Sequence, residues 1–270
     1  MFILLDSKQF ALDFEGNKYS MKPALGYNWI EPLTSWDDIP NGELLRDLEN
    51  DLLRPNLKYC FGQHLLKVGS LSSEIDCTDS LIPHQINLTP TLNKEGNAGI
   101  TAEFDELPLG ENTIDAVLIN HVLEFSADPH QVLREAHRVL LPNGNLMLSV
   151  FNPISLLLLS RLWPIRSNKH FWRGRWFTIG RIKDWLNLLG FEVVEESYCC
   201  YSTMLTKKSN LHTGKTARVL ASTLPKLGSA CIITAKKREW PLTPIRPRFR
   251  YKTVFHPAVR SAPASRTSVK

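Results

Sequence analysis

The most regular pattern of apolar and polar positions lies within residues 113–153, and the other segments are arranged around it. It opens with the apolar run 114–119, which suits a strand buried on both faces of a sheet. The Asp-Pro pair at 128–129 then supplies a helix N-cap and a proline at the first helical position. The apolar residues that follow recur at three- and four-residue spacing and form one stripe: Val132, Leu133, Ala136, Val139 and Leu140. Pro142-Asn143-Gly144 ends this helix and 146–151 is a second apolar run, so the stretch predicts a right-handed crossover unit of a parallel sheet.

The same patterns predict further elements on both sides of that unit. Leucines at helical spacing predict a helix from about Gly42 to Leu53, which we expect to cover one edge of the sheet. Another stripe predicts a helix that begins after Thr178 and ends at Gly190. Five more short apolar segments are expected to be strands, the last two as an antiparallel pair: 64–69, 83–88, 99–104, 191–201 and 228–236. The connections 71–82 and 91–99 are short and polar, so loops or single turns are expected there instead of long helices.

Motifs in and around the central unit carry a resemblance to a known family. They are Leu107-Pro108, Ile114-Asp115-Ala116-Val117, Asn120-His121-Val122-Leu123-Glu124, Asp128-Pro129, the run from Leu133 to Leu140, and Pro142-Asn143-Gly144. Together they resemble class I S-adenosylmethionine-dependent methyltransferases of the type 11 branch. Two further segments are similar to a bacterial methyltransferase-like group: 151–155, and 184–191 with its Asp-Trp-Leu and Leu-Gly-Phe. The resemblance covers roughly residues 60–238 and implies an α/β, Rossmann-like fold, with a mainly parallel seven-stranded sheet and an antiparallel last strand.

The resemblance also implies a site for S-adenosylmethionine after the first strand. In the family this strand ends in an acid, followed by a Gly-x-Gly-x-Gly loop. The glycines let the backbone approach the methionine part of the cofactor, and the acid holds its ammonium. Here Gly69 and Ser70 keep the start of the loop, whereas Lys67, Leu71 and Ser73 replace the acid and the other two glycines. A lysine that faced the ammonium of the ligand would repel it.

Three more positions of the implied cofactor site follow the next strands. Asn87, with Leu88, stands where the family has an acid that grips the ribose hydroxyls, and an asparagine can make such bonds without the charge. Glu103 and Phe104 occupy the pair that meets adenine; an ordinary acid at the end of a strand is the alternative for Glu103. Asn120 follows the fourth strand, where ligands of open α/β sheets bind.

His121 and Glu124 lie in the same loop after the fourth strand, which we expect to face the cleft. A histidine there is a candidate base for an oxygen or nitrogen nucleophile, and packing beside the cofactor is the other interpretation. Methyl transfer is an in-line displacement that depends chiefly on proximity, so it does not require a base. The catalytic residues therefore stay unassigned, and no metal site is predicted.

Composition narrows the class of protein. Of the 270 residues, 43% are hydrophobic and 22% charged, which is typical of a globular chain. The five cysteines lack metal-binding spacing and are expected to be free thiols in a reducing compartment. The apolar run 2–5 has no basic segment before it, and 156–159 is too short to span a bilayer. A cytoplasmic protein without a transmembrane segment is expected.

The chain divides into an irregular segment at 1–35, a methyltransferase-like domain at 36–238 and a basic, proline-rich tail at 239–270, which composition predicts to be disordered. Within the domain, 155–177 is rich in arginine and tryptophan and is expected to be a substrate lid, with core packing of its tryptophans as the alternative. Met21 is an alternative start.

Two classes of function remain open at this point. One is methyl transfer from S-adenosylmethionine to an unidentified small molecule or macromolecule. The other is an inactive methyltransferase fold that serves as a binding or scaffold module. Both leave room for RNA as a partner of the basic lid and tail, which the sequence supports by charge alone.

Overall fold

The predicted crossover unit forms the middle of the molecule. In this computed structural model, which describes residues 31–90, 99–155, 171–201 and 223–239, strand β4 spans Ile114–Asn120 and helix α3 spans Pro129–Val139. The Asp128 carboxylate accepts hydrogen bonds from the backbone N–H groups of His130 and Gln131, as an N-cap should. Strand β5 spans Leu140–Phe151. The predicted start of this strand at 146 is wrong. Leu140 already pairs with Ile114 of β4, and the Pro142-Asn143-Gly144 segment lies within the strand.

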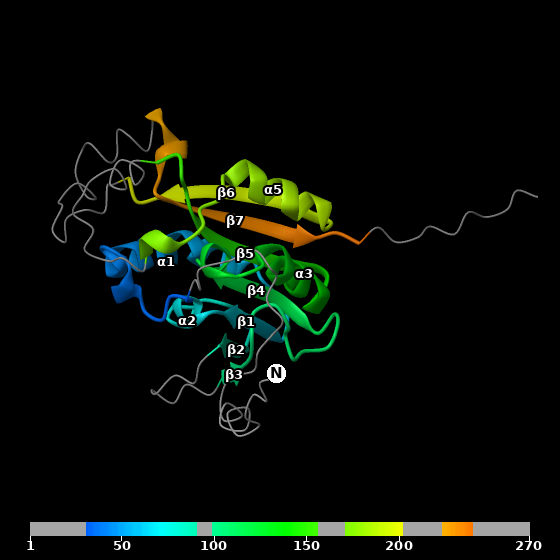
Figure 1. The fold of residues 1–270 in the computed structure, drawn as a ribbon. Coiled ribbons are helices and arrows are strands. Elements are labelled where there is room, and N and C mark those ends of the chain that lie inside the picture. The colour runs from blue at the N-terminus through cyan, green and yellow to red at the C-terminus, as the bar shows by residue number, and fades with distance from the viewer. Residues whose placement is uncertain (1–30, 91–98, 156–170, 202–222, 240–270) are drawn as a thin grey trace, which may run out of the picture. The chain divides into compact units, whose positions relative to one another are not determined.

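The described residues contain one seven-stranded sheet with the order β3-β2-β1-β4-β5-β7-β6 (Figure 1). β7 is antiparallel to both of its neighbours, and every other pairing is parallel, which confirms the predicted fold class. The remaining strands are β1 (His64–Val68), β2 (His84–Thr89), β3 (Gly99–Thr101), β6 (Phe191–Cys199) and β7 (Ala230–Lys237). The predicted extension of the third strand to residue 104 is wrong, because β3 pairs with β2 over only three residues.

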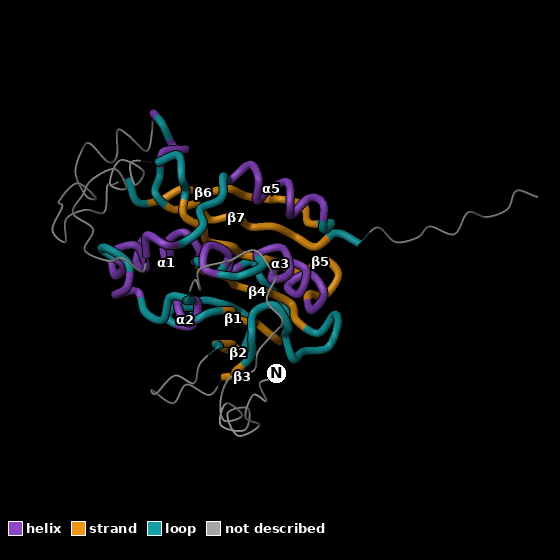
Figure 2. The backbone as a smooth tube through the Cα atoms, in the orientation of Figure 1, coloured by secondary structure: helices purple, strands orange, loops and turns teal. Residues whose placement is uncertain are grey.

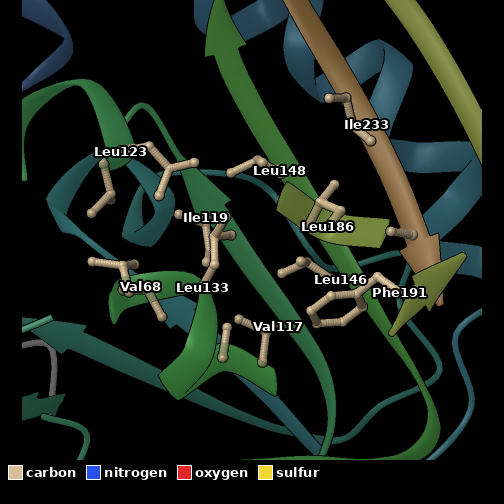
Figure 3. Close-up of a cluster of buried hydrophobic side chains, with 14 of the residues drawn as sticks. Val68, Val117, Ile119, Leu123, Leu133, Leu146, Leu148, Leu186, Phe191 and Ile233 are labelled. Atoms are coloured by element: carbon tan, nitrogen blue, oxygen red, sulfur yellow. The ribbon is translucent and has the colours of Figure 1, made fainter. Parts of the chain in front are cut away.

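One face of the sheet is covered by α3 and by α5, which spans Ile179–Leu188 (Figure 2). Alternate residues of the strands point to this face, and Figure 3 shows Val117, Ile119 and Leu148 packed with Leu133 of α3 and Leu186 of α5. All of these side chains are buried. Burial on both faces explains why these strands are apolar runs rather than alternating sequences.

The opposite face is covered by α1, which spans Gly42–Lys58. The prediction that this helix ends near Leu53 is wrong, because it continues to Lys58, whereas its contacts with β6 and β7 agree with the predicted position over one edge of the sheet. Leu53 and Leu57 are fully buried in one cluster that includes Ile232 of β7 as well as Leu118 and Met147, so α1 packs on the face of the sheet near β6 and β7. Burial of Leu57 favours continuation of the helix through Pro55, which lies in its last turn, where loss of one N–H costs least.

The connection between β1 and β2 holds only α2, a single turn at Ser70–Ser73, which confirms that the first crossover helix is shortened. The next connection falls largely within 91–98, outside the described residues. Short 3₁₀ helices occur at Trp36–Asp38 (η1), Leu123–Phe125 (η2), Phe171–Arg173 (η3) and Pro225–Leu227 (η4). The described residues all belong to one compact unit, 1–239, and none of their helices is long and apolar enough to cross a membrane. The second unit, 240–270, lies outside the described residues.

Candidate functional site

The residues predicted to bind the cofactor lie at or near the carboxyl ends of β1, β2, β3 and β4. Gly69 follows β1 directly and has a φ of 95°, a conformation that side chains rarely adopt. A Cβ atom at this position would lie 2.6 Å from Cγ2 of Val122, in the loop after β4. The Gly69 N–H donates to the carbonyl of Leu88 at 2.8 Å, which ties the turn to β2. The one family glycine that this chain keeps is therefore required by the turn itself.

Lys67 does not act as the sequence suggested. Its side chain is buried, and its Nζ donates to the backbone carbonyl of Ile75 at 2.9 Å, just beyond α2. A carbonyl of the chain itself thus engages the amine, so the repulsion considered for a lysine that faced the ammonium of the ligand does not follow from the sequence alone. This hydrogen bond joins β1 to the segment after α2. No other residue of β1 replaces the acid that the family has at this position.

The loop that replaces the glycine-rich segment is stabilised by its own hydroxyl groups. Ser72 Oγ donates to the Val68 carbonyl at 2.5 Å and accepts from the Asn120 N–H at 2.8 Å. Ser73 Oγ donates to the Gly69 carbonyl at 3.2 Å. The carbonyl of Leu71 accepts from the Trp36 indole at 3.1 Å. Side chains thus take the place of two glycines, and the loop becomes a helical turn that is joined to β4.

Asn87 and Leu88 belong to β2, which continues to Thr89, so Asn87 precedes the end of the strand. Leu88 is fully buried and supplies the carbonyl that holds Gly69. Asn87 Oδ1 is buried and has no hydrogen-bond partner among the described residues. An unpartnered buried acceptor is costly in a native structure and calls for a donor. A ribose hydroxyl is such a donor, and Asn87 stands where the family binds ribose.

Glu103 and Phe104 lie in the turn after β3 and not within a strand. Glu103 is exposed, whereas Phe104 packs into the core cluster shared with α3. Arg138 of α3 fixes the segment that follows: its guanidinium donates to the carbonyls of Leu107 and Leu109 at 2.9 and 2.8 Å. This arrangement leaves the Glu103 carboxylate accessible beside a fixed turn, as binding of an adenine amine would require.

A buried polar cluster lies at the ends of β4 and β5. Asn120 Nδ2 donates to Glu49 of α1 at 2.7 Å and to Ser149 of β5 at 3.0 Å. His121 Nε2 donates to the other oxygen of Glu49 at 2.7 Å. The side chains of His121 and Glu49 are completely buried. The loop predicted to face a cleft is thus covered, and α1 supplies the carboxylate that covers it.

His121 is a cation in this setting. Burial alone would lower the pKa of its imidazole, but the negative charges of Glu49 and Glu124 and the hydrogen bond to Glu49 outweigh that effect and raise the pKa to about 9. The ring stacks on Phe151 at 3.8 Å between centroids and meets the edge of Trp36 at 5.9 Å. A protonated, enclosed imidazole cannot accept a proton at neutral pH. The structure therefore favours packing over the role of a base.

Glu124 completes the cluster. Its Oε1 accepts from the backbone N–H of Phe151 at 2.6 Å and lies 3.6 Å from His121 Nδ1. Its Oε2 is buried without a hydrogen-bond partner among the described residues, as are Asn120 Oδ1 and His121 Nδ1. The cluster thus combines four hydrogen bonds with three buried polar atoms that have no hydrogen-bond partner among the described residues.

The lid interpretation applies to a segment that is only partly described, because 156–170 lies outside the described residues. Phe171 is fully buried, and Trp172 and Trp176 are half-buried with their rings 5.6 Å apart. Phe171 also meets the edge of Phe151 at 5.0 Å. Arg175 anchors this segment through its N–H, which donates to the Glu124 carbonyl at 2.8 Å. The aromatic rings of 171–176 therefore extend the core beside the polar cluster.

Glu49 is the residue that the sequence analysis missed. A signal for it exists in the pattern of the first helix, where Leu45, Glu49 and Leu53 share one face at four-residue spacing. A carboxylate within an otherwise apolar stripe indicates a buried partner. The identity of that partner is not readable from the sequence, because His121 lies 72 residues further along the chain.

Comparisons with known proteins agree with this geometry. A methyltransferase domain family model, type 11, matches residues 75–148. The uncharacterized protein YafS of Escherichia coli is 37% identical over 223 residues, 83% of this chain and 88% of its own length. The mitochondrial 2-methoxy-6-polyprenyl-1,4-benzoquinol methylase of Bos taurus is 36% identical over 74 residues, 27% of this chain and 22% of its own length.

Solved structures show the same fold. An S-adenosylmethionine-dependent methyltransferase from Archaeoglobus fulgidus has a TM-score of 0.50 at 21% identity, covering 71% of this chain and 94% of its own. A chain from the complex of the Haloferax volcanii Trm112 methyltransferase activator with a methyltransferase has a TM-score of 0.52 at 12% identity, covering 74% and 93%. At these identities the likeness concerns the arrangement of the sheet and its helices.

Proposed function

Because this chain belongs to the type 11 branch of the class I methyltransferases, we propose that it transfers a methyl group from S-adenosylmethionine to an oxygen or nitrogen atom of a small-molecule or macromolecular acceptor. The single observation that carries the proposal is the buried, unpartnered Oδ1 of Asn87 beside the Gly69 turn. It is an acceptor without a donor at the position where the family binds the ribose of its cofactor.

The residues present fit the adenosine part of the cofactor. Asn87 would accept from a ribose hydroxyl, and Gly69 with Ser70 would let the backbone approach the ligand. Glu103 would accept from the adenine amine, and Phe104 and Leu88 would support these positions from the core. When bound, S-adenosylmethionine supplies an electrophilic methyl group.

The chain itself would contribute binding, orientation and exclusion of water. The aromatic rings of 171–176 and the enclosed polar cluster keep water away from the ends of β4 and β5. Exclusion of water and a fixed geometry are the main requirements of an in-line displacement. His121 is protonated at neutral pH, so we assign it no role as a base. The nucleophile of the acceptor would lose its proton to solvent or to another group.

A fold without activity is the second candidate, and one observation favours it. The loop after β1 has side chains in place of two glycines, and its Leu71 and Ser72 are buried. In that case Glu49 and His121 would serve only to lock α1 onto the sheet. The protein would then present its surface to a partner without binding the cofactor.

Titration calorimetry with S-adenosylmethionine and with its demethylated product separates the two candidates. Binding of either ligand at micromolar to millimolar concentration supports methyl transfer, and no heat together with no thermal shift at millimolar ligand would rule it out. Lys67→Met is an informative variant, because the lysine amine contacts Ile75 and we place it outside the ligand site. We expect its affinity for the ligands to stay within about threefold of the wild type, a change below about 1 kcal/mol.

All five cysteines are buried and none forms a disulfide among the described residues, which supports a reducing compartment, and we propose a cytoplasmic location on that basis. Burial raises the pKa of the Cys60 thiol to about 11, so this thiol is not reactive at neutral pH. Cys199 and Cys200 are likewise buried. Packing of these two residues, and not redox chemistry, is the interpretation we propose.

A further inference from the structure

The chain lacks the acidic side chain that the family uses at the end of the first strand to bind S-adenosylmethionine. It carries buried acidic side chains at the ends of β4 and β5 instead. The cofactor has an amino-acid ammonium, and the family binds it with an acid at the end of the first strand. Here that position is Lys67, which is engaged by the Ile75 carbonyl. A ligand ammonium bound at the carboxyl end of β1 therefore needs an anion from another element.

The cluster at the ends of β4 and β5 has more acidic than basic side chains. It holds the carboxylates of Glu49 and Glu124 and the imidazolium of His121, whose pKa is raised to about 9. Two carboxyl groups thus stand beside one imidazole in a group of side chains that water does not reach. Burial of an uncompensated charge is costly, so a cationic ligand group would be stabilised here.

Two oxygen atoms of this cluster are available to such a group. The N–H groups on Asn120 Nδ2 donate to Glu49 and Ser149. These two hydrogen bonds fix the orientation of the amide, so its Oδ1 is the acceptor that has no partner among the described residues. Glu124 uses Oε1 for the Phe151 N–H, which leaves Oε2 as the second free acceptor. Both side chains are only 1% exposed. Two fixed acceptors in this acidic cluster match the donors of a primary ammonium.

The cluster also lies at the correct end of the sheet. The Asn120 N–H donates to Ser72 Oγ at 2.8 Å, and Ser72 belongs to the turn that replaces the glycine-rich loop. The free oxygens are thus joined through one residue to the segment that the methionine part of the cofactor approaches in the family. The two oxygens that lack a partner in the described part of the chain are therefore linked to the loop beside the position where the family has its acid.

We propose that Glu124 Oε2 and Asn120 Oδ1 bind the amino-acid ammonium of the cofactor and take over the role of the acid absent from β1, with Glu49 as the residue that orients Asn120. This inference rests on the proposed function. Both oxygens are covered in the structure, so binding requires the packing around them to rearrange. α1 supplies the contact to Asn120 through Glu49, and we expect its hydrogen exchange to change when the ligand binds.

The test uses full-length protein and two ligands that differ in one group. They are the demethylated cofactor and its analogue in which hydrogen replaces the amino group, each measured by calorimetry. We expect the wild type to prefer the amine-bearing ligand by about 10- to 100-fold, as for a charge-assisted hydrogen bond. Glu124→Gln keeps an oxygen for the Phe151 N–H and removes the free carboxylate oxygen, so the preference should fall to near one. Equal melting temperatures of variant and wild type would show that the fold is kept.

Glu103→Gln is the matched control, since it makes the same chemical change at the adenine end. It should weaken both ligands by the same factor and leave the preference intact. If Glu124→Gln also weakens both ligands equally, or changes neither affinity, the oxygens are satisfied by something other than the ammonium, such as a buried water, and the inference is overturned while the proposed function stands. If wild-type protein binds neither ligand, the proposed function fails and the inference fails with it.

Discussion

At the scale of single residues, the site is decided by polar side chains that are enclosed by the core. Glu49, Asn120, His121 and Glu124 are all buried, yet they are spread over α1, the end of β4 and the turn after it. Enclosed charges persist only when they are paired or needed by a ligand. Their protonation should therefore be visible in the stability of the protein.

The raised pKa of His121 predicts a loss of stability at alkaline pH. Its imidazole has a pKa of about 9 in the folded protein and an ordinary value of 6.5 when unfolded, so the folded state holds the proton more tightly. This contribution is complete below pH 6.5 and is lost as the pH rises through 9. We expect the melting temperature to fall between pH 7 and pH 9.

Direct observation of the ring provides the control for this prediction. An NMR titration should place His121 well above pH 7, whereas burial and the nearby Lys237 lower the pKa of His137 below 6.5. A His121 ring that titrates near or below 6.5 would contradict the charged cluster. The buried thiols such as Cys60 act above pH 9, so the window from 6.5 to 9 reports on the histidine.

Replacement by alanine should change the stability of the protein in opposite directions at two glycines. Gly69→Ala should destabilise the protein by about 1–3 kcal/mol and weaken cofactor binding, because its φ of 95° is strained for alanine and the new Cβ would lie 2.6 Å from Val122. Gly180→Ala, in α5, meets nothing within 4 Å and should stabilise by about 0.5–1 kcal/mol. Chemical denaturation of both variants measures the difference, and equal effects would show that the turn after β1 is not as described.

At the scale of elements, α3 positions the turn that carries Glu103. Glu135 accepts from the Leu107 N–H at 3.0 Å and pairs with Arg138 at 2.7 Å. Arg138 in turn donates to the carbonyls of Leu107 and Leu109. One face of a helix thus fixes the backbone of a neighbouring loop through a pair of opposite charges.

Replacement of Arg138 by methionine should loosen this loop. The variant loses hydrogen bonds from a charged donor to two carbonyls, but the side chain is 30% exposed and its pairing is partly screened by water. We expect a cost of about 1 kcal/mol and faster hydrogen exchange at the Leu107 amide. Arg134→Met is the matched control, since Arg134 is exposed and only 3.7 Å from Asp128, and it should leave this exchange unchanged.

At the scale of the whole molecule, the described core belongs to residues 1–239. The sheet joins segments from both ends of this unit, because β7 near its end lies between β5 and β6. α1 and α3 then cover opposite faces of that sheet (Figure 1). Folding of the site therefore depends on β7.

Removal of residues 240–270 should leave the melting temperature within about 2 °C of the full chain and cofactor affinity unchanged, because a cost below 1 kcal/mol shifts a domain of this size little. If RNA is a partner, the truncation should also flatten the salt dependence of binding, with a log–log slope smaller by about 0.7 for each lost phosphate contact. Replacement of Arg246, Arg248 and Arg250 by alanine is the control that separates charge from length. An unchanged slope in both proteins would exclude the tail as a contact.

The sequence by itself determined the architecture. The apolar run of β4, the stripe of α3 and the Asp-Pro cap between them are local patterns, and each is imposed by burial on one or both faces of an element. The motifs around them identified the family, and the family implied the mainly parallel seven-stranded sheet with an antiparallel last strand that the structure has. The loss of the long helix after β1 followed from the short and polar connection.

Only the tertiary structure decided the chemistry of the site. The sequence shows a lysine in place of an acid, but not that the amine turns to the Ile75 carbonyl. It shows Glu49 in a leucine stripe, but not that this carboxylate meets Asn120 and His121, about seventy residues away. Such contacts depend on how α1 lies across the sheet, and that packing is set by the sum of many weak apolar contacts from distant segments. Local patterns fix which residues are buried, whereas the fold fixes which buried charges face each other.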